Sequence, residues 1–149
     1  MTFKQQIHHH FLQLVNNKIN QLQQVLHDLR ESGANETKST AGDKYETALA
    51  MLQIEQDNTR AQLQEVLQQK AVLQKIDPAI STVAVVNGSV VKTGQGYFFI
   101  SAALGKAEIS NCTVTALSSS SPLGKQFMHL QKGDSTRFNN REYTLEDIL

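Results

Sequence analysis

Apolar residues recur at three- and four-residue steps in two long segments before residue 78. This spacing places them on one helical face and predicts helices near residues 2–31 and 41–75. The two stripes are Ile7, Phe11, Leu14, Val15, Ile19, Leu22, Val25, Leu26 and Leu29, and then Tyr45, Ala48, Leu52, Leu63, Val66, Leu67 and Leu73. Narrow stripes favour two helices that bury one seam against each other as an antiparallel coiled coil within the chain. Pairing between chains is the competing arrangement.

A polar segment at residues 32–43 separates the two predicted helices and forms the tip of the hairpin. Gly33 is expected to end the first helix as a left-handed cap. Thr40 and Asp43 have the spacing of a capping box, which starts the second helix near residue 41. Carboxylates gather around this tip, interrupted by two lysines: Glu31, Glu36, Asp43, Glu46, Lys38 and Lys44. The interpretation we favour is that the carboxylates complement the helix dipole or stay solvated. The alternative is that some of them bind a metal or a partner.

After Pro78 the pattern changes to short β-type runs at residues 82–86, 89–91, 97–100 and 111–117. The pattern predicts hairpin turns at Asn87-Gly88 and at residues 94–96. It also predicts that Asn139-Asn140 joins two strands at 136–138 and 142–144. A short helix is predicted from Ser121 as N-cap, Pro122 at the first helical position, and one apolar face of Leu123, Phe127 and Leu130. The chain is therefore predicted to be α+β, with a helical hairpin in residues 1–77 and a small antiparallel sheet domain with one short helix in residues 78–149.

Charge and cysteine content narrow the function classes. Fourteen basic and fourteen acidic side chains give no net charge, and each predicted part is close to neutral by itself. No global field then draws the chain to nucleic acid, and no apolar run approaches the roughly 20 residues of a membrane helix. Cys112 is the only cysteine, which excludes an intrachain disulfide. With no signal peptide evident at the N-terminus, we expect a soluble cytoplasmic protein.

No catalytic or metal-binding set emerges from the residues. The run His8-His9-His10 is either native or a remnant of a tag, and adjacent helical positions lie about 100° apart, so its three rings cannot converge on one ion. The serine run at 118–121 has only His129 nearby, at the far end of the same short helix. We therefore expect a protein that is not an enzyme and has no metal of its own.

The second part of the chain resembles the Gre-type transcript-cleavage factors of bacterial RNA polymerase. The resemblance rests on the run Ser120-Ser121-Pro122-Leu123-Gly124-Lys125, then Gly133-Asp134, and then a closing hairpin that leads into Glu142-Tyr143-Thr144-Leu145. It implies an FKBP-like fold for residues 78–149, and the order of coiled coil, linker and small domain covers essentially the whole chain. It also implies a transcription elongation role in which the coiled coil enters the secondary channel of the polymerase.

In that family an acidic tip helps hold a second Mg²⁺, shared with the polymerase active site, for cleavage of backtracked RNA. When Tyr45 is aligned with the tyrosine of the family tip, Lys38 and Ala41 fall where the family has Asp and Glu. Glu36 and Asp43, with Glu46 beside them, are the carboxylates left to assist Mg²⁺. We therefore predict binding to polymerase with weak or absent stimulation of cleavage. The partner-binding residues that the resemblance implies are Lys38, Ser39, Thr40, Lys44, Tyr45, Ser121, Pro122, Lys125 and Asp134.

Two other functions compete with a polymerase regulator. A coiled-coil scaffold would use the hairpin to pair with another chain, without any role at polymerase. An FKBP-like prolyl isomerase would need a concave aromatic pocket, whereas a domain this small needs most of its rings for its core. We expect no isomerase activity.

Overall fold

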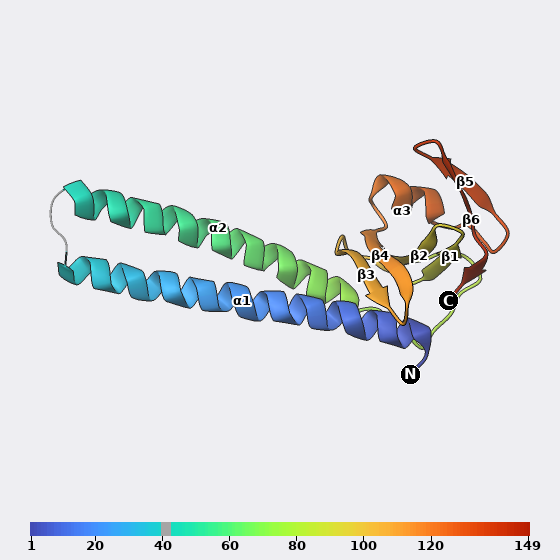
Figure 1. Cartoon of the computed structure of the whole chain (residues 1–149), viewed down its shortest axis with the longest axis horizontal. Helices are drawn as coiled ribbons and strands as arrows, with labels where there is room; N and C mark the ends of the chain where they lie inside the picture. Colours follow the sequence, from blue (N-terminus) through green and yellow to red (C-terminus); the bar gives the residue numbers. More distant parts are fainter. Residues whose placement is uncertain (40–42) are drawn as a thin grey trace. The chain divides into compact units, whose positions relative to one another are not determined.

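A computed structural model of the chain describes the backbone at residues 1–39 and 43–149 and the side chains at residues 1–34 and 45–149. Two long antiparallel helices, α1 (Phe3–Ser39) and α2 (Asp43–Gln74), come first and pack together (Figure 1). Strands β1 (Val90–Thr93), β2 (Gly96–Ser101), β3 (Gly105–Ile109) and β4 (Cys112–Ser118) follow. Helix α3 (Pro122–Phe127) and strands β5 (Ser135–Phe138), β6 (Arg141–Thr144) and β7 (Asp147–Ile148) complete the chain. The α+β class is as predicted.

Contacts divide the chain into two compact units. One comprises residues 1–13 with 71–149, and the other comprises residues 14–70. The first unit thus holds the whole sheet together with the start of α1 and the end of α2. The domains at residues 1–77 and 78–149 stay a prediction about folding units.

Helix α2 carries a regular seam with steps of three and four residues. Its buried or half-buried positions include Tyr45, Leu49, Leu52, Gln56, Thr59, Leu63, Val66, Lys70 and Leu73. This is the heptad spacing that keeps one face toward a partner helix. Two residues of the predicted apolar stripes are exposed. They are Leu67 of α2, which is 41% exposed, and Val25 of α1, which is 45% exposed. Thr59 is nearly buried within the seam, and its hydroxyl donates to the Glu55 carbonyl at 2.8 Å.

The predicted end of the first helix at Gly33 is wrong, because α1 continues to Ser39. Gly33 does not have the positive φ of a left-handed cap. Glycine inside a helix costs about 1 kcal/mol relative to alanine, which a long helix packed on a neighbour can absorb.

The main sheet has five strands in the order β3-β4-β2-β1-β7. Strands β1 and β2 form an antiparallel hairpin in which Val90 pairs with Phe99 and Thr93 pairs with Gly96. Strands β2 and β4 are parallel, with Phe99 opposite Ala116, so the sheet is mixed rather than wholly antiparallel. Strand β3, which the residue pattern did not indicate, pairs with β4 along its length. The hairpin of β5 and β6 forms a separate two-stranded sheet.

The run at residues 82–86 is not a strand, contrary to prediction. Ala84 makes only an isolated bridge to Gln131, and Val85 exchanges backbone hydrogen bonds with Leu130 and His129. Strand β1 already lies between β2 and β7, so the run has no free place beside its neighbour in the chain.

Side chains of β2 pack against other elements on both faces of the sheet. Alternate residues of a strand point to opposite faces, so Phe98 and Phe99 lie on different sides. Phe98 packs with Phe127 of α3 and with Tyr143, at ring centroid distances of 5.2 and 5.7 Å. Phe99 meets Phe11 of α1 at 6.0 Å on the other face. The first turns of α1 therefore belong to the core of the sheet domain.

Candidate functional site

The motif that begins at Ser121 forms a capped helix at the end of strand β4. Ser121 has extended backbone at φ −66° and ψ 157°, and its Oγ accepts a hydrogen bond from the Gly124 amide at 3.1 Å. The same hydroxyl donates to the Ser118 carbonyl at 2.6 Å. Pro122 occupies the first turn, where its missing N–H costs nothing. The predicted N-cap and proline position are both confirmed.

Gly124 explains why the motif has a residue without a side chain at this position. A Cβ there would overlap the Ser118 carbonyl oxygen and would lie 2.8 Å from Ser121 Oγ and 3.0 Å from a Leu117 methyl group. The helix can therefore approach the end of β4 only because residue 124 is glycine. Lys125, the residue after Gly124, is exposed at the surface.

Asp134 builds the turn that leads into strand β5. One carboxylate oxygen accepts a hydrogen bond from the Gln131 amide at 2.7 Å, and the Asp134 carbonyl accepts one from the Leu145 amide at 2.8 Å. Gly133 precedes it at φ +92°, a conformation that favours glycine. Asp134 thus has the turn role that its position in a Gly-Asp pair suggests, and its side chain stays exposed.

The structure brings the segments of these two motifs together. Thr136 of β5 donates a 2.8 Å hydrogen bond to the side-chain oxygen of Gln126 in α3. Ser121, Pro122 and Lys125 lie in or next to α3, whereas Asp134 comes directly before β5. The four predicted residues therefore lie on adjoining elements of one unit, with Lys125 and Pro122 open to a partner.

Most of the predicted tip residues lie outside the described part of the chain. These are Thr40 entirely, and the side chains of Glu36, Lys38, Ser39, Asp43 and Lys44. Of the others, Glu46 is exposed on α2, and Tyr45 is half-buried at the start of the seam. The tip carboxylates as a possible Mg²⁺-assisting group stay a prediction.

The histidine run is divided between two environments. His8 places Nε2 at 2.7 Å from the Leu73 carbonyl near the end of α2, and its ring lies edge-on to Phe99. His9 and His10 are exposed. Within residues whose placement is described, no group of three His, Cys, Asp or Glu side chains is arranged to hold a metal. Likewise, none of the described helices is long and apolar enough to span a membrane.

Sequence reasoning missed Lys4, which reads as an ordinary solvated lysine at the start of a helix. The side chain is only 7% exposed, and Nζ donates a 2.6 Å hydrogen bond to the Ile80 carbonyl. Burial lowers the pKa of the Lys4 ammonium below its usual 10.5, and the negative charge of Asp77 acts in the opposite direction. No local pattern signals this burial, since it depends on a segment far along the chain.

Comparison of the chain with models of protein families, with curated proteins and with solved structures found no match. The order of elements, with two long helices followed by a small sheet domain, is compatible with a Gre-like fold.

Proposed function

We propose that the chain is an RNA polymerase-binding regulator of transcription elongation, which inserts its helical hairpin into the secondary channel. The observation that carries the proposal is the order of parts, in which a long antiparallel hairpin precedes a sheet domain with a capped Ser-Pro-Leu-Gly helix. A 32-residue helix such as α2 is about 48 Å long at 1.5 Å per residue, which is long enough to reach into a deep channel.

The exposed face beside α3 is the second contact in this proposal. Pro122 and Lys125 are open to solvent, while Ser121 and Gly124 serve to shape the helix from within. A rigid, capped helix loses little conformational entropy when a partner binds. The sheet domain would therefore hold the outer surface of the polymerase while the hairpin enters the channel.

The proposal does not require the protein to supply catalysis. Cleavage belongs to the polymerase, with Mg²⁺ held in its own active site, and carboxylates such as Glu36 and Asp43 would at most assist it. Lys38 and Lys44 raise the local potential and oppose the approach of a second cation. We therefore propose a binding regulator of the cytoplasm with weak or no stimulation of cleavage.

Prolyl isomerisation is less well supported than polymerase binding. Phe98, Phe127 and Tyr143 pack on one another at centroid distances of 5.2 to 5.7 Å and are at most 8% exposed. Rings used in this way form a core and leave no concave aromatic surface for a proline. The scaffold alternative has one observation in its favour, which is the 60% exposure of Met51 and Ile54 on α2.

A photo-crosslinking experiment with bacterial core RNA polymerase tests the proposal. Glu46, which is exposed near the start of α2, is replaced by p-benzoylphenylalanine, and the exposed Lys106 of β3 carries the same group in a control protein. We expect crosslinks from position 46 to the two largest polymerase subunits, which disappear when a known secondary-channel factor competes. Absence of binding, or crosslinks that survive the competitor, would overturn the proposal.

A further inference from the structure

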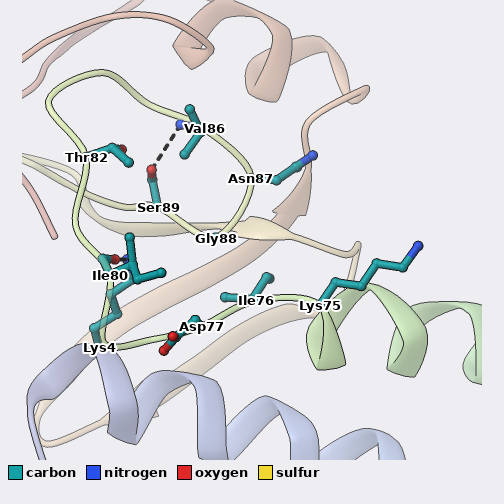
Figure 2. Close-up of a pocket in the computed structure, with 10 residues that line it drawn as sticks. All are labelled: Lys4, Lys75, Ile76, Asp77, Ile80, Thr82, Val86, Asn87, Gly88 and Ser89. Carbon is teal, nitrogen blue, oxygen red and sulfur yellow. Dashed lines mark hydrogen bonds between the residues drawn. The ribbon is translucent and has the colours of Figure 1, made fainter.

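A small cavity lies beneath the segment 77–89, within the compact unit that contains the sheet (Figure 2). Its volume is about 210 Å³. Its residues come from the start of α1 and from the segment that connects α2 with β1. None of them belongs to the tip of the hairpin or to the α3 motif, so the cavity is separate from the site described above.

Hydrogen bonds and one close packing contact hold the loop over this cavity. The Val86 amide donates to Ser89 Oγ at 3.0 Å, as Figure 2 shows, and the Gly88 amide donates to the Ile100 carbonyl at 2.7 Å. Gly88 has a φ of +94°, and a Cβ there would lie 2.9 Å from Cγ2 of Ile76. The loop therefore has a defined shape before any partner arrives, which reduces the entropic cost of binding.

The lining combines apolar side chains with charged groups of both signs. Ile76, Ile80 and Val86 provide the apolar part, and the charged groups are Lys4, Lys75 and Asp77. The Lys4 ammonium uses one of its three donors on the Ile80 carbonyl and is largely removed from water. A desolvated ammonium gains most from a carboxylate that can accept its remaining N–H groups.

The rim of the cavity exposes apolar surface. Of its apolar lining residues, Ile80 is 58% exposed and Val86 is 37% exposed. Residues 78–91 contain no charged side chain. Exposed apolar side chains beside a cavity provide area that a bound protein segment can cover.

We propose that this cavity and its rim bind a segment of a partner protein that places a carboxylate side chain between apolar residues. The cavity is smaller than the roughly 300 Å³ at which pockets for drug-sized ligands begin, so it fits one or two side chains better than a cofactor. The buried Lys4 ammonium complements the carboxylate, and the exposed side chains of Ile80 and Val86 cover its neighbours. The proposal goes beyond polymerase binding, since it concerns a second surface and does not depend on which protein supplies the segment.

An NMR titration of the full ¹⁵N-labelled chain tests the proposal with blocked peptides as probes. The first peptide is acetyl-Ala-Leu-Glu-Leu-Ala-amide, and a matched peptide has Gln in place of Glu. We expect saturable shifts at residues 4 and 76–89, and binding of the Gln peptide about tenfold weaker, the usual value of one charge-assisted hydrogen bond. Equal binding of both peptides, shifts elsewhere on the chain, or no saturable shift would overturn the proposal.

Variants separate the role of the ammonium from that of the apolar rim. Lys4→Met keeps the length of the side chain and should remove the preference for Glu over Gln. Val86→Ser should weaken both peptides about threefold through lost apolar burial, and Val72→Ser, an equally exposed valine outside the cavity, should change neither. Since Val86 lines the cavity and is 37% exposed, that variant tests the surface even if Lys4→Met does not fold.

A small free carboxylic acid is a second type of ligand that offers the cavity a carboxylate beside an apolar group. Isovalerate, titrated in the same way, carries a branched apolar group and a carboxylate without peptide backbone. If isovalerate binds as tightly as the Glu peptide, the site belongs to a small metabolite and the proposed partner segment is wrong. We expect it to bind far more weakly, because it leaves the exposed rim uncovered.

Discussion

The Lys4 ammonium donates a 2.6 Å hydrogen bond to the carbonyl of Ile80, 76 positions later in the chain. This bond ties the first turn of α1 to the segment that connects α2 with the sheet. It also places a cation where little water reaches it, with Asp77 as the nearby opposite charge. The start of the first helix and the connecting segment are thus parts of one folded unit.

We predict that Lys4 makes the stability of the protein depend on pH in the alkaline range. The folded-state pKa of Lys4 lies below the 10.5 of the unfolded chain, so the unfolded state binds more protons between these two values. The free energy of unfolding of the wild type should therefore rise, relative to Lys4→Met, as the pH increases toward 10.5. Urea denaturation of both proteins from pH 7 upward measures this difference.

The control for this prediction is Lys106→Met, at an exposed position of β3. It removes the same charge at the surface, so a pH dependence that both variants share would come from the lost charge and not from the burial of Lys4. A wild-type advantage over Lys4→Met that falls with rising pH would contradict the assigned direction of the pKa shift.

Two glycine-to-alanine substitutions should have opposite effects. Gly124→Ala forces a methyl group against the Ser118 carbonyl and should cost about 3 kcal/mol or more. Gly33→Ala adds a methyl group in open space inside α1 and should stabilise the helix by up to about 1 kcal/mol. Thermal and urea unfolding of the two variants, followed by circular dichroism, measure both changes. An unchanged stability for Gly124→Ala would show that α3 does not approach β4 as closely as described.

Cleavage of backtracked RNA should be stimulated weakly or not at all. The measurement is the rate of transcript cleavage by a backtracked elongation complex in Mg²⁺, with wild-type protein, Glu36→Ala and Asp43→Asn. We expect all three proteins to give a rate close to that of the polymerase alone, because the pair that the family uses is replaced at Lys38 and Ala41. Strong cleavage by the wild type, lost in both variants while binding persists, would show that Glu36 and Asp43 do serve the metal.

The protein should not accelerate prolyl isomerisation of a standard X-Pro peptide. Phe127 is fully buried and meets Tyr143 edge-on at 5.7 Å, so neither ring is free to stack on a substrate. A protease-coupled assay, with an FKBP enzyme as the positive control, measures the rate. Turnover that is proportional to protein concentration would reverse this assignment of the rings to the core.

Features decided by a few consecutive residues could be predicted from the sequence. The Ser121 cap, Pro122 in the first turn and the turn at Asn139-Asn140 are such cases, and both asparagines have the positive φ that the turn demands. The two helices were predictable for a similar reason, since their periodicity repeats every few residues. The buried positions along the helices were less predictable, because Leu67 fits the apolar pattern and is nevertheless exposed.

Features that depend on distant partners were decided only by the tertiary structure. A parallel pair such as β2 and β4 needs two strands to meet across an intervening segment, and the residue pattern of each strand is the same for either direction. The run at 82–86 has strand-forming residues but makes only an isolated bridge, from Ala84 to Gln131, since both sides of β1 are occupied. Lys4 is buried because the segment at residue 80 folds over it. The residues around Lys4 in the sequence do not predict this contact, because Ile80 lies far along the chain.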